Sequence, residues 1–409
     1  MRDNPERLAW TVLGLSFGVC CLLAVLVPLG VRSYLLYATD AQVTAITSIR
    51  STVLAETGSA NLPIPITDGN TIEVEEGARI STDATSQAIL TFFNDSALTM
   101  YGLTSLRVQS ARSPRFGLSQ EPDTIVVQLE SGRIRVVPAV RTNPEVGRGL
   151  RFEVHTPQAQ IFLSEGSFSV EIVGDETLVT ARQGEAHLYA SGQEIVLETG
   201  ERAVVKAGQP PSSPMPAERN LIINGDFLAG LEDSWQAYKV EPPGGVVTAS
   251  LKVLTDEFET GLRLLSEGKD NLHSEVGVKQ SIEKSVQDFD SLRIQLNVRL
   301  VFQSLPGGGT LGSEFPLMVH LAYKDADGND RDWYHGFYYT PPPENWMLPA
   351  TPDNSSERIA RFLWYPYESP NLLDTLGASR PVFLKYLRIY ASGWLYESYV
   401  ADVRVLAQE

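Results

Sequence analysis

The chain has 409 residues, of which 43% are hydrophobic and 20% charged, and its formal net charge is −17 at pH 7. Such an acidic chain lacks the basic face that phosphate binding requires, so we expect no nucleic-acid partner. Its only two cysteines, Cys20 and Cys21, lie close to the amino terminus. The remainder must therefore be held together by core burial without disulfides, and its length suffices for two or three domains.

Residues 8–31 form an uncharged, mostly apolar stretch between Arg7 and Arg32. A helix of that length spans about 36 Å, against about 30 Å for the hydrocarbon core of a bilayer. We predict a transmembrane helix over 8–31 that contacts the lipid bilayer, preceded by a short cytoplasmic tail at 1–7. A cleaved signal peptide is the alternative, but it would have a shorter apolar region and a better cleavage site than residues 39–41 offer.

The charges that flank this stretch predict its orientation. Arg2, Arg7 and the amino terminus lie on one side and Arg32 on the other. Cytoplasmic flanks carry the excess of lysine and arginine. We therefore expect a single-pass membrane protein with a cytoplasmic amino terminus and an extracytoplasmic body.

Residues 32–66 show a helical period at their centre. Val43, Ile46, Ile49 and Val53 recur at three- and four-residue steps, which predicts a juxtamembrane helix followed by a proline-bearing spacer. A dimerising stalk is the alternative interpretation, but two heptads are few for a coiled coil. We expect the helix to pack on the next domain.

Residues 67–206 change to a period of two. Apolar residues alternate with other residues at Ile72 and Val74, at Ile125, Val127 and Leu129, at Ile134 and Val136 after Ser131-Gly132, and at Phe168, Val170 and Ile172. Short strands punctuated by glycine turns predict an all-β domain made of hairpins or of a short β-solenoid.

This region resembles a FecR domain. Gly69–Val108 is similar to the opening of the family, and Leu129–Val137 and Phe152–Ile172 are similar to its later strands. The positions that match the family's Thr-Pro-x-Ala-x-Val-x-Gly-Thr-x-Phe pattern are Thr156, Pro157, Ala159, Gly166 and Phe168, with Ser167 in place of the second threonine. The resemblance covers about a third of the chain and implies a β domain outside the inner membrane of a bacterium.

The same resemblance implies a signalling role. FecR proteins relay a signal through one transmembrane helix to a cytoplasmic segment that controls a sigma factor. Met1–Arg7 has seven residues, too few for a sigma-binding helix bundle. A FecR-type transmembrane regulator is therefore our second hypothesis.

Residues 207–219 hold four prolines and two serines and are interpreted as a semi-extended linker. The last domain, 220–409, is predicted to be a β-sandwich jelly roll, because strands such as 292–300 alternate apolar and polar residues. Its opening resembles galactose-binding-like jelly rolls, including many carbohydrate-binding modules. The matching residues are Asn220, Leu221, Asn224, Gly225, Asp226, Phe227 and Trp235.

The resemblance also bears on cofactors. Leu228 stands where relatives have a glutamate that helps bind a structural calcium, which argues against that calcium here. The sequence Asp325–Asp330 is better explained as a hairpin turn than as an EF-hand, since the sixth and twelfth loop positions hold Asp330 and Gly336. We expect no cofactor, and the residues of any metal site stay unknown.

Aromatic residues are dense between Trp333 and Tyr399, and flat rings with polar edges suit sugar binding. Filling a jelly-roll core is the alternative, which we prefer for Trp394 and Tyr399. The candidate ligand-binding residues are those in proline-rich loops, where binding residues concentrate: Trp346, Trp364, Tyr365 and Tyr367.

Catalytic patterns are weak. The five histidines are scattered without metal-ligand spacing, and the chain has no G-x-S-x-G or phosphate-loop motif. We predict no catalytic residues and a membrane-anchored extracytoplasmic binding protein of the cell envelope whose partner is a glycan or an envelope protein. A glycoside-active enzyme is the third hypothesis, since two carboxylates brought together in space would suffice.

Overall fold

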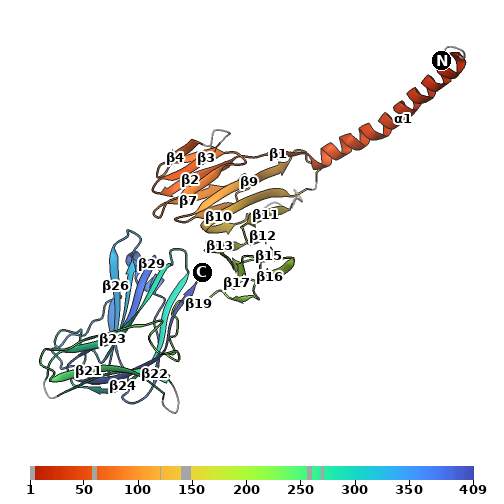
Figure 1. The fold of residues 1–409 in the computed structure, drawn as a ribbon. Helices are drawn as coiled ribbons and strands as arrows, with labels where there is room; N and C mark the ends of the chain where they lie inside the picture. The colour runs from red at the N-terminus through yellow and green to blue at the C-terminus, as the bar shows by residue number, and fades with distance from the viewer. Residues whose placement is uncertain (1–4, 58–61, 120, 140–148, 256–259, 269–270) are drawn as a thin grey trace. The chain divides into compact units, whose positions relative to one another are not determined.

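The chain is mainly β, as predicted, with one long helix at its amino end (Figure 1). The computed structural model describes residues 5–57, 62–119, 121–139, 149–255, 260–268 and 271–409. Residues 1–4 of the expected cytoplasmic tail lie outside the described residues. The chain divides into two compact units, Met1–Ala217 and Glu218–Glu409, which are named the first and second unit below.

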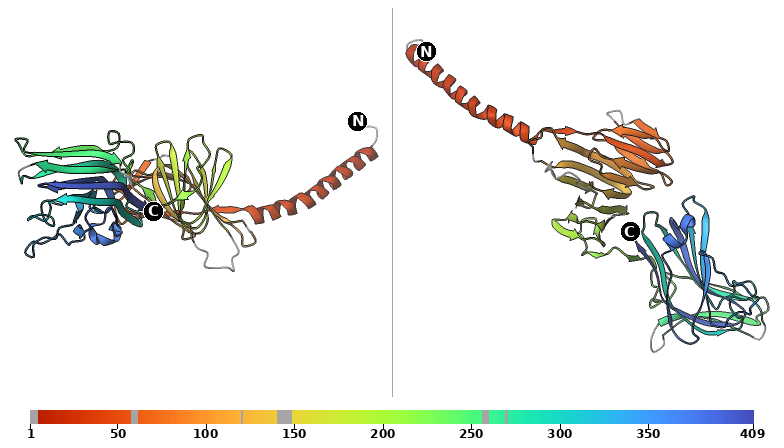
Figure 2. Two further views of the ribbon diagram at one scale, coloured as in Figure 1. Left: turned by 90° about the horizontal axis from the view of Figure 1, so that it is seen from below. Right: turned by 180° about the vertical axis from the view of Figure 1, so that it is seen from behind.

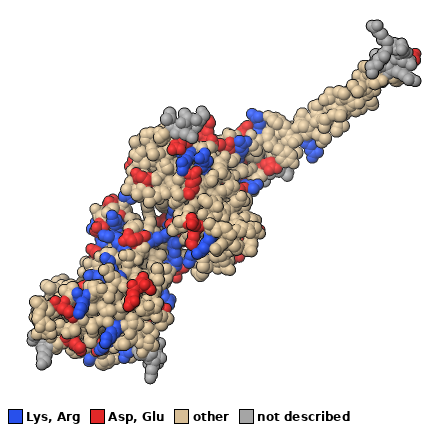
Figure 3. Space-filling view, in the orientation of Figure 1, with Lys and Arg blue, Asp and Glu red and all other residues tan. Residues whose placement is uncertain are grey.

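The amino-terminal helix α1 spans Pro5–Tyr37. Within its segment Ala9–Tyr37, a window of 18 residues has a mean hydropathy of 2.6, and none of that window is buried in the protein. On the face shown in Figure 3, charged side chains are scattered over the β part of the chain but leave most of the helix bare. Length and apolarity suit a membrane span or a signal sequence.

The segment after α1 is β structure, so the helix and spacer predicted over 32–66 are wrong. Its strands are β1 (Thr39–Ala41), β2 (Thr44–Arg50), β3 (Val53–Thr57) and β4 (Leu62–Ile66). Ile46 and Val53 are buried, but Val43 and Ile49 of the supposed helical stripe are 46% and 43% exposed. β-branched residues favour strands, and pairing of β2 with the distant strands β5 and β7 satisfies its backbone.

The remaining strands of the first unit complete one hydrogen-bonded network that closes on itself. They are β5 (Thr71–Val74), β6 (Arg79–Thr82), β7 (Gln87–Thr91), β8 (Ala97–Met100), β9 (Ser105–Pro114), β10 (Asp123–Val137), β11 (Leu150–His155), β12 (Gln160–Leu163), β13 (Ser167–Val173), β14 (Glu176–Gln183), β15 (Ala186–Ala190), β16 (Gln193–Leu197), β17 (Glu201–Lys206) and β18 (Met215–Pro216). Two runs of paired strands cross at β10. One is β4-β3-β6-β9-β10-β11-β12-β15-β16. The other is β5-β2-β7-β8-β10-β13-β14-β17-β18.

Gly132 is where β10 passes from one run to the other. Residues 124–131 pair with β9, whereas residues 134–137 pair with β8 and residues 132–136 pair with β13. Gly132 has φ +83°, and a Cβ there would lie 2.5 Å from the Cα of Thr104. Only glycine fits such a position. Ser131-Gly132 is thus a crossing point within one long strand instead of a turn between two.

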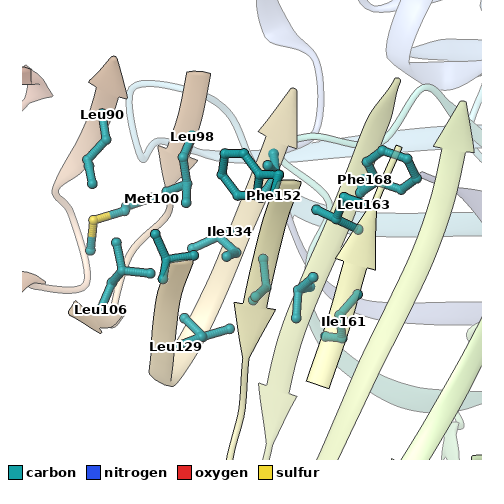
Figure 4. Packing of buried hydrophobic residues seen from close by; sticks show 14 of the residues in the cluster. Leu90, Leu98, Met100, Leu106, Leu129, Ile134, Phe152, Ile161, Leu163 and Phe168 are labelled. Carbon is teal, nitrogen blue, oxygen red and sulfur yellow. The ribbon is translucent and has the colours of Figure 1, made fainter. Parts of the chain in front are cut away.

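The core of the first unit lies between the two runs and is built from the inward residues of their strands (Figure 4). Leu106, Leu129, Ile134, Phe152 and Phe168 are all at most 1% exposed. The alternation seen in the sequence therefore packs a continuous apolar interior.

Most of the predicted linker 207–219 belongs to the first unit. Strand β18 pairs with β17, the backbone N–H of Ser212 donates to the carbonyl of Val204 (2.9 Å), and Ala217 is 2% exposed. Prolines, which lack an N–H, are tolerated at the edge of a sheet. The free spacer expected from composition is therefore shorter than predicted.

The second unit is a β-sandwich, as predicted (Figure 2). One layer, the β30 sheet, has the order β21 (Val247–Thr255), β22 (Thr260–Gly268), β30 (Tyr396–Gln408), β24 (Ser291–Gln303) and β28 (Tyr365–Glu368), and β19 (Arg219–Asn220) also pairs with β30. The other layer, the β29 sheet, has the order β20 (Gln236–Val240), β23 (Ser274–Ser285), β29 (Phe383–Gly393), β25 (Leu317–Lys324), β26 (Asp330–Tyr338) and β27 (Asn354–Arg358). A short helix α2 (Leu372–Thr375) and a 3₁₀ turn η2 (Gly377–Ser379) precede β29.

The asparagines that open the second unit hold its chain in place. The Asn220 side-chain oxygen accepts from the backbone N–H of Val405 on β30 (3.0 Å). Asn224 donates to the carbonyl of Gly230 (2.6 Å), and its own carbonyl accepts from the Trp235 indole (3.0 Å). The motif used for the resemblance is therefore explained by the architecture of this loop.

Candidate functional site

The four residues predicted from the sequence to bind a ligand lie in different surroundings. Trp346 is half-buried in the segment between β26 and β27. Trp364 is half-buried just before β28, with its ring edge-on to Tyr399 at 6.4 Å. Tyr365 and Tyr367 lie on β28, where Tyr365 donates a hydrogen bond to Glu357 (2.6 Å).

Tyr367 is a core residue, which corrects its assignment to a ligand-binding face. Its ring is 8% exposed, stacks on His335 at 4.5 Å and meets Phe337 edge-on at 5.0 Å. Burial raises the pKa of its hydroxyl. Trp364, by contrast, packs on Tyr399, which alternates along β30 with buried neighbours and so lies on the outer face of the β30 sheet. The structure does not bring Trp364 and Tyr367 together.

A second group of aromatic residues, missed by the sequence analysis, lies on the outer face of the β29 sheet. Along β29, Leu387, Ile389 and Ala391 are fully buried in the core. The residues that alternate with them point to the opposite face, because successive side chains alternate across a sheet. They are Tyr386, Arg388 and Tyr390.

Strand register places polar and aromatic side chains in one row across four strands. Lys279 on β23 pairs with Arg388, Arg388 pairs with His320 on β25, and His320 pairs with Tyr334 on β26. Side chains at paired positions are close neighbours on one face. Three nitrogen-bearing side chains and a phenol therefore lie side by side.

Tyrosines flank this row on both sides. The row on one side runs from Tyr238 on β20 through Gly277 to Tyr390. The row on the other side contains Tyr386 and ends at Asp332. Gly277 clears the space between the two tyrosines, since a Cβ there would lie 2.5 Å from the carbonyl oxygen of Ile389.

The rings contact the nitrogen-bearing groups directly. His320 stacks on Tyr334 at 4.4 Å and 15°. The Lys279 ammonium lies 3.8 Å from the centre of the Tyr386 ring, and the Arg388 guanidinium lies 4.0 Å from that of Tyr390. Such cation–π contacts hold the side chains in fixed positions.

Two carboxylates balance the positive charges. Glu275 accepts from the Tyr238 hydroxyl (2.8 Å) and lies 3.3 Å from Arg388. Asp332 lies 2.7 Å from Nε2 of His320. Burial lowers the pKa of His320, against the opposing effect of Asp332, and burial together with Glu275 raises the pKa of Tyr238.

One end of this face is covered by other parts of the second unit. Phe315 packs with Met318 and Tyr390, and Gly336 makes room for it, since a Cβ there would lie 2.6 Å from the Phe315 ring. Near the other edge, a shallow depression of about 480 Å³ is lined by Ile223 and by residues 232–236 and 279–281. The outer face of the β29 sheet, with Tyr238, Lys279, His320, Tyr334, Tyr386 and Arg388, is named the tyrosine face.

The tyrosine face offers the groups that carbohydrate recognition needs. Phenol rings present flat apolar surfaces, and amine, guanidinium and carboxylate groups donate or accept hydrogen bonds. A signal for it exists in the sequence, because Phe383–Gly393 alternates Leu387 and Ile389 with Tyr386, Arg388 and Tyr390. Which of the two faces of the sheet is buried becomes clear only from the packing of the sandwich.

The Asp325 loop is a hairpin turn between β25 and β26, as predicted. One oxygen of Asp325 accepts from the N–H groups of Asp327 and Asn329, and the other accepts from Arg331 at 2.9 Å. The hydrogen bond from Arg331 is the main cause that lowers the pKa of this carboxyl to about 2. Within the part of the chain that the structure describes, no three His, Cys, Asp or Glu side chains gather as a metal site would require.

No family model matches the chain, and no curated protein matches it in sequence. Solved structures similar to part of this chain include a candidate anti-sigma factor from Parabacteroides distasonis, with 16% identity, a TM-score of 0.27 and coverage of 34% of this chain. The match spans 59% of that protein, less than two thirds of its length.

Other similar structures are carbohydrate-binding modules. The family 11 module from Clostridium thermocellum, in complex with a β-1,3-1,4-mixed-linked tetrasaccharide, has 15% identity and a TM-score of 0.28, with coverage of 46% of this chain and 94% of the module. The module TmCBM61, in complex with β-1,4-galactotriose, has 13% identity and a TM-score of 0.26, with coverage of 47% and 99%. These likenesses do not assign the chain to a family, and the chemistry of its candidate site is argued from its own residues.

Proposed function

We propose that this chain is a membrane-anchored envelope protein whose second unit binds a glycan on the tyrosine face. Tyr238, Tyr334 and Tyr386 would stack on sugar rings, and Lys279 and Arg388 would donate hydrogen bonds to their hydroxyl groups. The proposal is for binding without cleavage and without a cofactor.

The observation that carries the proposal is the register of the β29 sheet. It places three half-buried tyrosines around Lys279, His320 and Arg388 on one face. Large rings with polar tips are usual where one partner is partly apolar and partly hydrated, which describes a pyranose ring. Contact with water alone would not explain why several tyrosine rings lie together on this face.

The membrane anchor is the second part of the proposal. The uncharged run of α1, its hydropathy and its complete exposure within the protein support a lipid-facing helix. The excess of arginine before the run supports a cytoplasmic amino terminus. The two β units would then lie outside the cytoplasm, where envelope glycans are found.

A binding assay on the full chain in nanodiscs tests the glycan proposal. The probes are soluble β-1,3-1,4-glucan, β-1,4-galactan and peptidoglycan fragments, measured by calorimetry against the wild type and against Tyr386→Ala. Tyr399→Ala is the matched control, because Tyr399 is also half-buried but lies on the outer face of the other sheet.

We expect at least one probe to bind, Tyr386→Ala to weaken it about tenfold, and Tyr399→Ala to leave it unchanged, since losing one stacked ring costs about 1.4 kcal/mol. Equal loss in both variants, or no binding of any probe, would remove the glycan proposal. Chromatography of the incubated probes distinguishes binding from hydrolysis, and released fragments would favour the enzyme hypothesis.

A transmembrane signalling regulator is the alternative function, favoured by one observation. The last turn of α1 is hydrogen-bonded to the segment that follows β9, since Ser119 donates to the carbonyl of Leu36 (2.5 Å) and Arg115 donates to the hydroxyl of Tyr34 (2.7 Å). A fixed joint of this kind would let a change in the β unit reach the helix. Sigma-factor-dependent transcription in a deletion strain, compared with the parent, tests this function.

A further inference from the structure

The segment Arg115–Ser119 follows β9 and contacts the end of α1; it is named the Phe116 loop. Leu118 at its tip is 72% exposed, and Gly117 beside it is also exposed. Single exposed leucines are common on soluble surfaces, so the exposure of Leu118 does not by itself indicate a binding surface. The contacts of the loop with α1 give the exposure its meaning.

Four contacts attach the Phe116 loop to the end of α1. The Arg115 backbone N–H donates to the carbonyl of Ala38 (2.9 Å), and its guanidinium donates to the Tyr34 hydroxyl (2.7 Å). The Phe116 ring lies edge-on to Tyr34 at 5.5 Å. The Ser119 hydroxyl donates to the carbonyl of Leu36 (2.5 Å). The loop is therefore held beside the last turn of the helix, at the same height along the helix axis.

The depth of the loop in the proposed membrane follows from where the apolar run of the helix ends. Arg32 is the first charged residue after the apolar run and marks the edge of the hydrocarbon core. Tyr34 comes two residues later, about 3 Å along the axis, whereas the headgroup layer is about 5–7 Å thick on each side. A loop bonded to Tyr34 and Leu36 lies at the depth of the lipid headgroups.

The composition of the joint fits this depth. Tyr34 and Tyr37 are 54% and 63% exposed, and tyrosine is enriched where membrane meets water. Arg32 is a cation on a flexible stem, which keeps its head near phosphate groups while the stem contacts apolar surface. The Arg115 guanidinium is held within the joint by the carboxylate of Asp40 at 3.3 Å and by the Tyr34 hydroxyl. A leucine exposed among such residues gains an apolar environment if it turns toward the acyl chains.

We propose that the Phe116 loop is a second membrane contact of this protein, with Leu118 inserted into the lipid interface beside α1. The inference rests on the proposed membrane anchor. Its partner is the same bilayer that the helix spans. The contact would hold the base of the first unit at the membrane surface at a point other than the helix itself.

Spin labelling in nanodiscs of phosphatidylethanolamine and phosphatidylglycerol tests the contact. Cys20 and Cys21 are the only cysteines, so Cys20→Ala and Cys21→Ala give a background in which one introduced cysteine carries the nitroxide. The test position is Leu118→Cys. The control is Leu103→Cys, which is 68% exposed in the turn between β8 and β9. A third label, Val25→Cys, reports on α1.

We expect the label at 118 to be more accessible to oxygen than to a water-soluble nickel chelate, as the label at 25 is, and the label at 103 to show the reverse. If the label at 118 is as accessible to the chelate as the label at 103, while the label at 25 is still in lipid, the inference is overturned and the anchor stays intact. Chelate access at 25 as well would overturn the anchor and, with it, the inference.

Discussion

Two histidine–tyrosine stacks on opposite faces of the β29 sheet show how similar ring geometry can have different roles. Inside the sandwich, His335 stacks on Tyr367 at 4.5 Å and lies parallel to Trp333 at 6.0 Å. On the outer face, His320 stacks on Tyr334 at 4.4 Å. Burial lowers the pKa of both histidines, to about 4 for His335.

The difference lies in their neighbours. The hydrogen-bond partner of His335 Nδ1 is the hydroxyl of Ser355 at 2.8 Å, its Nε2 lies 3.9 Å from the carboxylate of Glu357, and Tyr367 of the opposing sheet covers its ring. His320 has the carboxylate of Asp332 as its partner and Arg388 beside it in the strand register. Aromatic density in a sequence therefore predicts neither core nor binding surface. The side of the sheet on which a ring falls decides its role.

Removing the inner tyrosine should produce the largest effect. Tyr367→Ala leaves a cavity in the core, and such aromatic-to-alanine changes cost about 3–5 kcal/mol. Tyr334→Ala, the matched change in the outer stack, should cost much less because Tyr334 is only half-buried. Urea unfolding of the full chain, followed by tryptophan fluorescence, measures both. Equal costs would mean that the two stacks do not differ as described.

The inner histidine should make the second unit sensitive to acid. An unfolded histidine titrates near 6.5, whereas burial holds the folded pKa of His335 at about 4. The unfolded state then binds the proton first, so stability is complete above pH 6.5 and is lost as the pH falls toward 4. The full loss is about 3 kcal/mol.

His335→Gln removes the titrating group and should flatten this dependence, as measured by urea unfolding across that pH range. His273→Gln is the control, since His273 is exposed, and it should leave the slope as in the wild type. A slope that persists in His335→Gln would assign the acid sensitivity to another group.

Trp364→Ala contrasts the site predicted from the sequence with the tyrosine face. Trp364 packs half-buried on Tyr399, so its loss should cost about 1–2 kcal/mol of stability. Glycan binding should not change, because the ring lies on the outer face of the β30 sheet. Calorimetry with the best-binding glycan and thermal unfolding measure the two quantities. Loss of binding with unchanged stability would restore the sequence-based site.

The sequence predicts correctly the elements whose pattern is local, and it fails where distant strands decide the structure. The alternation in β10 and β24 predicts strands and buried residues correctly, because a period of two has one structural interpretation there. Val43, Ile46, Ile49 and Val53 fit helical and strand periods alike, and pairing with distant strands settled the question. The tyrosine face needed the register of five strands, which no local pattern contains.

The smallest expected effect tests the electrostatics of the outer stack. Asp332 lies 2.7 Å from His320 and raises the pKa of its ring, against the larger effect of burial. Asp332→Asn should therefore lower the pKa of His320 further, as measured by the shift of its ring resonances with pH. Stability should fall by about 0.2–1 kcal/mol, because Asp332 is half exposed and water screens the pair.

Asp330→Asn is the matched control, since this carboxylate on the same strand pairs with Lys385 at 3.2 Å. It should leave the His320 titration unchanged. An unaltered titration in Asp332→Asn would show that the carboxylate does not hold the ring. A histidine held by Asp332 keeps its buried ring flat against Tyr334 and so fixes the position of that half-buried tyrosine on the proposed glycan-binding face. Loosening the ring should therefore weaken glycan binding more than it weakens the fold.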